Sequence, residues 1–136
     1  MRSLLNLARL DLMEKDYDSL TKQIDAAESL EFSSLSSGTR ANFHLLQAQT
    51  AYYQSDNFEK SLEFAKMALE INEFEVNEKG IVYSLAVMVQ AELRLNRLES
   101  ARCNAERGLE INKRLKNSFG IRKFEKYLTE ITKLAQ

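Results

Sequence analysis

The sequence contains no proline, four glycines and one cysteine among its 136 residues. Strand-rich domains need proline and glycine at their many turns, so their scarcity favours helices. The single cysteine excludes an intrachain disulfide and gives no sign of an oxidising compartment. No apolar run approaches the ~20 residues that span a bilayer, and Arg9 and Asp11 interrupt the N-terminal stretch too early for a signal-peptide core. These absences predict a helical, cytoplasmic protein without a membrane segment.

Sequence motifs for catalysis or metal binding are missing as well. The chain has no phosphate-binding glycine loop, no HExxH and no GxSxG. His44 is the only histidine and has no cysteine or carboxylate at metal-ligand spacing. Cys103 lies beside Arg102 and near Arg107, and we interpret it as a packing or surface residue rather than a reactive thiol. We therefore expect no enzymatic activity, no bound metal and no cofactor.

Charge is distributed unevenly along a chain whose 44% apolar and 29% charged content is typical of a globular protein. Residues 1–78 carry 14 acidic and 7 basic side chains (−7), whereas residues 79–136 carry 6 and 12 (+6), which sums to the net charge of −1. The basic residues alternate with glutamates and lack a series of stacking aromatics. We therefore do not expect a nucleic-acid partner, and interpret the basic residues as a solvated face that could attract an acidic protein.

A repeat is the strongest positive feature of the sequence. LEIN occurs at residues 69–72 and again at 109–112, and the small residues before it coincide in three pairs: Ser61/Ala101, Ala65/Ala105 and Ala68/Gly108. Gly80 likewise matches Gly120, and each follows an asparagine, Asn77 or Asn117, that suits a helix N-cap. A shift of 41 residues brings the N-terminus into the same register, where Tyr17, Phe58 and Leu98 align.

The apolar period within each unit is helical and is broken once by a short polar stretch. It predicts seven helices, at 2–14, 17–31, 38–55, 58–73, 77–95, 98–116 and 118–136. They would form one all-α domain over 1–136, with hairpin units at 1–35, 36–76 and 77–116 and a capping helix at 117–136. In that last helix the apolar stripe consists of Phe124, Leu128, Ile131 and Ala135.

This pattern resembles the tetratricopeptide repeat (TPR) family. The second unit keeps the family's large and small positions at Leu45, Ala48, Tyr52, Phe58, Ser61, Ala65 and Ala68. The third unit keeps Leu85, Met88, Leu98, Ala101, Ala105 and Gly108, but has Glu92 where tyrosine is usual. Glu73 and Lys113 replace the usual closing proline, and the period is 40–41 residues rather than 34. These departures resemble the long-repeat variety of bacterial regulatory and signalling proteins.

The resemblance implies a right-handed superhelix (an α-solenoid) that acts as a non-catalytic scaffold and binds a protein or peptide on the concave surface of the first helices. Mapped onto this chain, that surface contains Arg9, Gln47, Thr50, Tyr53, Gln54, Tyr83, Gln90, Arg94, Lys126 and Glu130. Amides and hydroxyls can satisfy a peptide backbone, although each of these residues could also simply face solvent. The positions of the family's C-terminal carboxylate clamp hold Leu5, Gln47, Tyr83 and Val87, so that clamp is not expected.

The first predicted helix leaves three alternatives open. Its apolar residues spread over more than one face, notably Leu4, Leu5, Leu12 and Met13. Several leucines in water would be a liability, so a homodimer, a partner or an upstream repeat could cover them. The chain would then be a homo-oligomerisation module, or a sensory or scaffold segment of a larger bacterial regulator such as a kinase or transcription factor.

Overall fold

The computed structural model describes residues 36–136, and this part of the chain is all helical. Its elements are α3 (Ser37–Tyr53), α4 (Phe58–Phe74), α5 (Glu78–Arg94), α6 (Leu98–Arg114) and α7 (Ser118–Ala135). Each lies within two residues of a helix predicted from the sequence, so these five predictions are confirmed. The predicted helices 2–14 and 17–31 lie outside the described residues. None of the described helices is long and apolar enough to cross a membrane.

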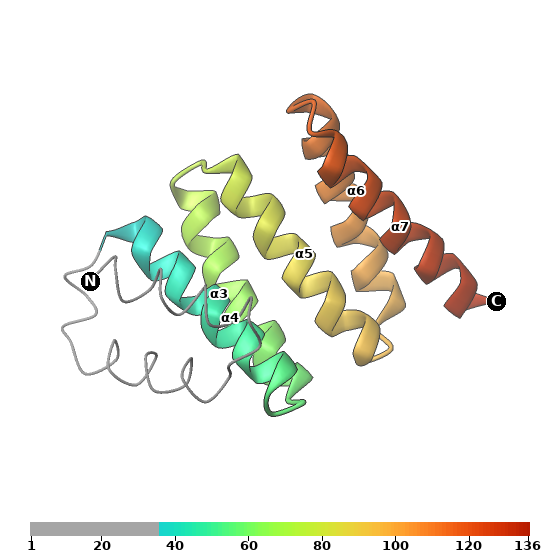
Figure 1. Cartoon of the computed structure of the whole chain (residues 1–136), viewed down its shortest axis with the longest axis horizontal. Helices are drawn as coiled ribbons and strands as arrows, with labels where there is room; N and C mark the ends of the chain where they lie inside the picture. The colour runs from blue at the N-terminus through green and yellow to red at the C-terminus, as the bar shows by residue number, and fades with distance from the viewer. Residues whose placement is uncertain (1–35) are drawn as a thin grey trace.

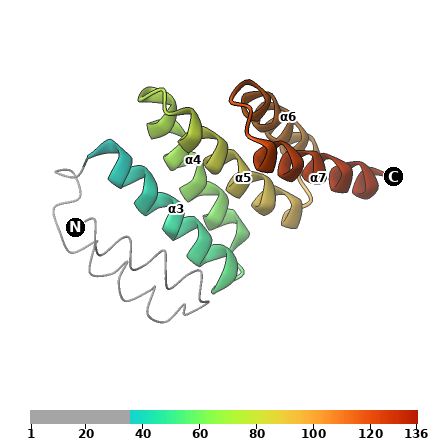
Figure 2. The same ribbon diagram turned by 45° about the horizontal axis from the view of Figure 1, so that its top comes forward.

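The helices pack in chain order, each against the next (Figure 1). Helices α3, α5 and α7 also contact one another in sequence, and Figure 2 shows them side by side in one layer with α4 and α6 behind them. The first helices of the two described hairpins and the last helix, α7, therefore contribute to the same surface. We call it the α3–α5–α7 surface.

The helix ends explain the short connections. Asn77 and Asn117 are N-caps, as predicted, and each side chain accepts a hydrogen bond from the backbone N–H of the glycine three residues later. At the end of α4, Val76 has a φ of 53°, its N–H bonds to the Glu73 carbonyl and the Asn77 N–H bonds to the Asn72 carbonyl. Asn96 and Lys116 end α5 and α6 in the same way. Left-handed residues therefore end these helices without a proline.

The crossings within the hairpins are built on alanines. Ala65, Ala101 and Ala105 are fully buried, so the helix backbones approach closely, as the matched small residues predict. Glu92, at the place of the usual tyrosine, is 3% exposed and accepts a hydrogen bond of 2.8 Å from the Asn104 side chain. A buried carboxylate of this kind is tolerated because the hydrogen bond satisfies it.

The structure also explains why LEIN recurs. Its asparagines, Asn72 and Asn112, are buried and lie against Gly80 and Gly120 of the following helix. A Cβ added at either glycine would overlap the side-chain amide of the facing asparagine. The motif and the glycine eight residues after it are therefore two sides of one contact that joins successive hairpins. The sequence shows both as matched letters but does not reveal that they touch.

Three arginines of the basic segment 79–136 form ion pairs with glutamates, two across neighbouring units (Arg97 and Arg107) and one within the third unit (Arg114). Arg107 lies 2.7 Å from Glu73, and Arg97 and Arg114 pair with Glu59 and Glu78 respectively. All are exposed, so each contributes little to stability. The pairs of Arg97 and Arg107 neutralise part of the charge asymmetry between neighbouring repeats.

Candidate functional site

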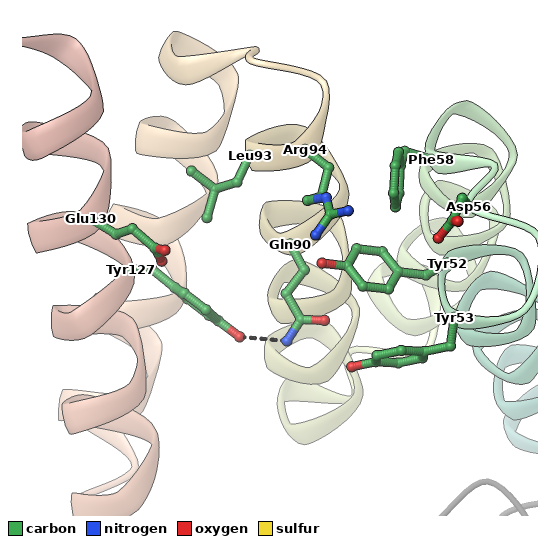
Figure 3. A pocket seen from close by; sticks show the side chains of 9 residues that line it. All are labelled: Tyr52, Tyr53, Asp56, Phe58, Gln90, Leu93, Arg94, Tyr127 and Glu130. Carbon is green, nitrogen blue, oxygen red and sulfur yellow. Dashed lines mark hydrogen bonds between the residues drawn. The ribbon is translucent and has the colours of Figure 1, made fainter. Parts of the chain in front are cut away.

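Two adjoining pockets open on the α3–α5–α7 surface. The larger has a volume of about 460 Å³, and we call it the Arg94 pocket; it is lined by Tyr52, Tyr53, Asp56, Phe58, Gln90, Leu93, Arg94, Tyr127 and Glu130 (Figure 3). The smaller, the lysine pocket, has a volume of about 370 Å³ and is lined by Gln49, Tyr53, Lys79, Val82, Tyr83, Ala86, Val87, Gln90, Asn112, Leu115, Asn117, Phe119, Gly120, Lys123 and Phe124. Tyr53 and Gln90 line both, so the pockets lie next to each other on the surface.

An arginine stacked on aromatic rings dominates the Arg94 pocket. The Arg94 guanidinium carbon lies 4.7 Å from the centre of the Phe58 ring and 5.9 Å from that of Tyr52. Tyr52 in turn packs edge-on against Phe58 and Tyr53, with ring centres 5.1 and 4.8 Å apart. Within residues 36–136 Arg94 forms no ion pair. The rings therefore hold a cation in place while its N–H groups stay available to a ligand.

Glutamines orient the tyrosines at successive steps of this surface. The Gln90 side-chain N–H donates to the Tyr127 hydroxyl at 2.9 Å, as Figure 3 shows, and Gln49, 41 residues before Gln90, donates to the Tyr83 hydroxyl at 3.0 Å. Burial raises the pKa of the Tyr127 hydroxyl, and the hydrogen bond from Gln90 opposes the rise. Tyr127 is therefore neutral at physiological pH, and its own O–H can still donate to a ligand.

The lysine pocket combines apolar walls with two cations. Phe119 is 71% exposed, and the side chains of Val82 and Leu115 lie partly exposed beside it. Lys79 and Lys123 reach this pocket from the N-terminal turns of α5 and α7. Burial lowers the pKa of the Lys123 ammonium group, because the partly apolar surroundings disfavour its charge.

The residues predicted for the concave surface are partly gathered in these pockets. Tyr53, Gln90, Arg94 and Glu130 line the Arg94 pocket, and Tyr83 lines the lysine pocket with Tyr53 and Gln90. Four others line neither: Gln47, Thr50, Gln54 and Lys126. The Thr50 hydroxyl donates to the Leu46 carbonyl at 2.8 Å, and the Gln47 oxygen lies 3.0 Å from a ring nitrogen of His44. Arg9 and the predicted interface residues Leu4, Leu5, Leu12 and Met13 lie outside the described residues.

Sequence reasoning missed several pocket residues. The repeat pattern assigned Tyr52 and Phe58 to packing positions and not to a binding surface. Tyr127 was not included in the predicted apolar stripe of the last helix. That stripe needs correction, since Tyr127 is buried and Ala135 is exposed. A signal was available, because four of the five tyrosines line the two pockets, namely Tyr52, Tyr53, Tyr83 and Tyr127.

The reactive residue types lie away from these pockets. His44 is half-buried, stacks 6.5 Å from the Phe64 ring and has its pKa lowered by burial. Cys103 is exposed on α6. Among the described residues, no group of three His, Cys, Asp or Glu side chains could hold a metal ion. The described lining of both pockets contains no histidine, cysteine or serine, and it offers ring faces, amides, carboxylates and cations.

Comparison with known proteins assigns no family: no family model matches this chain, and no curated protein matches it.

Proposed function

We propose that this chain is a non-catalytic module that binds an extended segment of a protein on the α3–α5–α7 surface. The single observation that carries the proposal is the pair of adjoining pockets, lined by four tyrosines and by the amides of Gln49 and Gln90. Tyrosine supplies a large contact area with little loss of conformational freedom. The side-chain amide of glutamine can donate a hydrogen bond to a peptide carbonyl and accept one from a peptide N–H.

The repeat supports an architecture for this module. We propose a long-repeat TPR-like array that winds as a right-handed superhelix, with the α3–α5–α7 surface as its concave side. The buried alanines at the crossings and the repeated Asn–Gly contacts support a regular stacking of hairpins. A signalling or scaffold role in the cytoplasm is part of the same proposal, because a binding module without catalytic activity exerts its effect through its partner protein.

The pockets suggest where the affinity resides. In most interfaces a few tyrosine, tryptophan or arginine side chains carry most of the binding energy. Tyr53 is central here because it lines both pockets, and Arg94 is held in place by stacking on Phe58. We expect the remaining lining residues to exclude water and to contribute less.

Selection from a library of random dodecapeptides, each held at both ends within a carrier protein, tests this proposal on the full chain. We expect peptides with a shared spacing of apolar residues to be selected. Tyr53→Ala and Arg94→Ala should each weaken their binding by about tenfold, the loss of one anchor. Matched controls are Met67→Ala and Arg122→Ala, since Met67 is 45% exposed, as Tyr53 is 48% exposed, and neither residue lines a described pocket.

Two results would contradict the proposed function. One is that no peptide is selected above background. The other is that selected peptides bind the Tyr53 and Arg94 variants as tightly as the parent while circular dichroism shows all variants folded.

A further inference from the structure

The two pockets differ in their charged groups. The Arg94 pocket contains two carboxylates, from Asp56 and Glu130, beside its single cation. The lysine pocket is lined by Lys79 and Lys123, and none of its described lining residues is acidic. The lysine pocket is therefore lined by positive charge alone, whereas the Arg94 pocket has charged groups of both signs.

The described part of the fold provides no acidic partner for these two lysines. Within residues 36–136 neither forms an ion pair, and Glu78, next to Lys79 in the chain, pairs with Arg114 instead. Lys123 is half-buried, and partial burial of an uncompensated charge costs free energy. An anion placed between the two ammonium groups would remove that cost.

Apolar surface adjoins these charges. The Phe119 ring is 71% exposed, Tyr83 is 47% exposed and Leu115 is 38% exposed, all around the same pocket. Exposed large apolar side chains that cluster beside a charge suit a ligand with both an apolar and an anionic group. A free inorganic anion would contact the lysines and leave the exposed apolar side chains uncovered.

A buried acceptor provides an independent observation. Asn112 is fully buried, its side-chain N–H donates to the Gly108 carbonyl at 3.0 Å, and its side-chain oxygen has no hydrogen-bond partner among the described residues. The same residue lines the lysine pocket. Buried acceptors are rarely left unpaired, so this wall of the lysine pocket contains an unsatisfied polar group.

We propose that the lysine pocket is the subsite for an acidic residue of the bound segment, with a large apolar residue next to it. The acidic side chain pairs with Lys79 and Lys123, and the apolar neighbour packs on Phe119. Because Tyr53 and Gln90 join the two pockets, the segment continues into the Arg94 pocket, so the carboxylate comes from a side chain within it. This inference rests on the proposed function and names the chemistry of its ligand.

The double variant Lys79→Gln/Lys123→Gln tests the inference in the same selection. On the parent chain we expect Asp or Glu beside a large apolar residue, and on the double variant we expect that preference to disappear. A selected peptide, made with acetylated and amidated ends, should bind the double variant about tenfold more weakly in fluorescence anisotropy. Lys113→Gln/Lys133→Gln is the matched control, because both lysines are exposed on the described surface and line neither pocket.

A double-mutant cycle gives the sharpest form of the test. Replacing the peptide's acidic residue by its amide should weaken binding to the parent chain about as much as the lysine substitutions do. The same replacement should have little further effect on the double variant, since the paired charge is already gone. Full additivity of the two losses would overturn the pairing.

The remaining outcomes separate this inference from the proposed function. Peptides that are selected but lack acidic residues, or that tolerate the double variant, overturn the lysine subsite and leave peptide binding intact. A selection that yields no peptide overturns the proposed function itself. Two further results would contradict an acidic side chain as the ligand. One is tighter, lysine-dependent binding of a single-stranded oligothymidine, and the other is binding only by peptides with a free C-terminal carboxylate.

Discussion

The junction between α4 and α5 and the junction between α6 and α7 occupy equivalent places in the repeat, yet they are completed differently. In both, a buried asparagine lies against a glycine of the next helix. At the first junction the Asn72 side chain donates to the Ser84 hydroxyl at 3.3 Å and accepts from the Asn77 amide at 3.4 Å. At the second, the position of Ser84 is held by Phe124.

The phenyl ring of Phe124 needs space that the first junction does not provide. Ala68 of the second unit corresponds to Gly108 in the third, and a Cβ at Gly108 would overlap the Phe124 ring. The second junction therefore replaces an alanine and a serine by a glycine and a phenylalanine. A hydrogen-bonded contact becomes an apolar one, and the Asn112 oxygen is left without a partner beside the lysine pocket. A repeat can thus keep its backbone geometry while the buried asparagine is fully hydrogen-bonded at one junction and keeps an unpaired oxygen, among the described residues, at the other.

The largest expected effect contrasts the two side chains that differ. Phe124→Ala should lower the free energy of unfolding by about 4 kcal/mol, since it removes a fully buried ring. Ser84→Ala should cost about 1 kcal/mol, because it leaves the Asn72 amide without one acceptor. Urea denaturation of both variants measures the difference. Equal losses would mean that the two junctions do not differ as the structure indicates.

A second prediction concerns the glycine that accommodates the ring. Gly108→Ala should destabilise the chain by about 2 kcal/mol through overpacking against Phe124, even though alanine favours helices. In a Phe124→Leu background the same change should cost at least about 1 kcal/mol less, because the smaller side chain leaves room for the methyl group. Additive losses in this double-mutant cycle would show that Gly108 is required for some other reason. Ala68→Gly, at the matched position, measures the loss of helix propensity together with the loss of a buried methyl group.

A smaller effect is expected where the helices end. Val76 and Lys116 are equivalent and both left-handed, with φ of 53° and 58°, but only Val76 is branched at Cβ. Val76→Gly should raise the free energy of unfolding by about 1 kcal/mol, because it relieves backbone strain that a β-branched residue bears most. Lys116→Gly should gain only about half as much, since the flexibility of glycine in the unfolded chain offsets most of the relief. Thermal unfolding of the two variants, compared at equal pH, checks the order.

The smallest expected effect lies inside the hairpin of α5 and α6 and depends on pH. Burial raises the pKa of Glu92 above its ordinary value of 4.5, while the hydrogen bond from Asn104 opposes the rise. The folded state therefore binds this proton more tightly than the unfolded state, so the Glu92 contribution to stability falls as the pH rises from 4.5 through the raised value. Glu92→Gln should match or exceed the parent in stability at pH 7, and the gap should close towards pH 4. A gap that widens at low pH would reverse the sign of this argument.

Local signals made most of the helical layout predictable from the sequence. The apolar period and the asparagines Asn77 and Asn117 fix where helices begin, because a cap acts within one turn. The matched alanines predicted the close crossings for the same reason, since their effect requires only a small side chain. The left-handed φ values at the helix ends could not be predicted from the sequence, because Val76 and Lys116 are not residues that normally adopt a left-handed conformation.

The pockets were harder to predict because they depend on how helices from different units lie. The repeat register pairs Gln90 with Glu130, forty residues later, whereas its hydrogen bond goes to Tyr127, thirty-seven residues later. The direction in which helices cross decides this, and a single sequence does not encode it locally. Likewise, nothing in the spacing of Lys79 and Lys123 shows that both reach one pocket.

The measurement that tests the account most directly is a two-dimensional ¹⁵N–¹H NMR titration of the full chain with a selected peptide. We predict that the largest shifts arise from the amides of Gln90, Asn112 and Lys123, and that the amides around Met67 and Glu106, on the layer of α4 and α6, stay unchanged. Shifts confined to that second layer, with the α3–α5–α7 surface unaffected, would contradict the account.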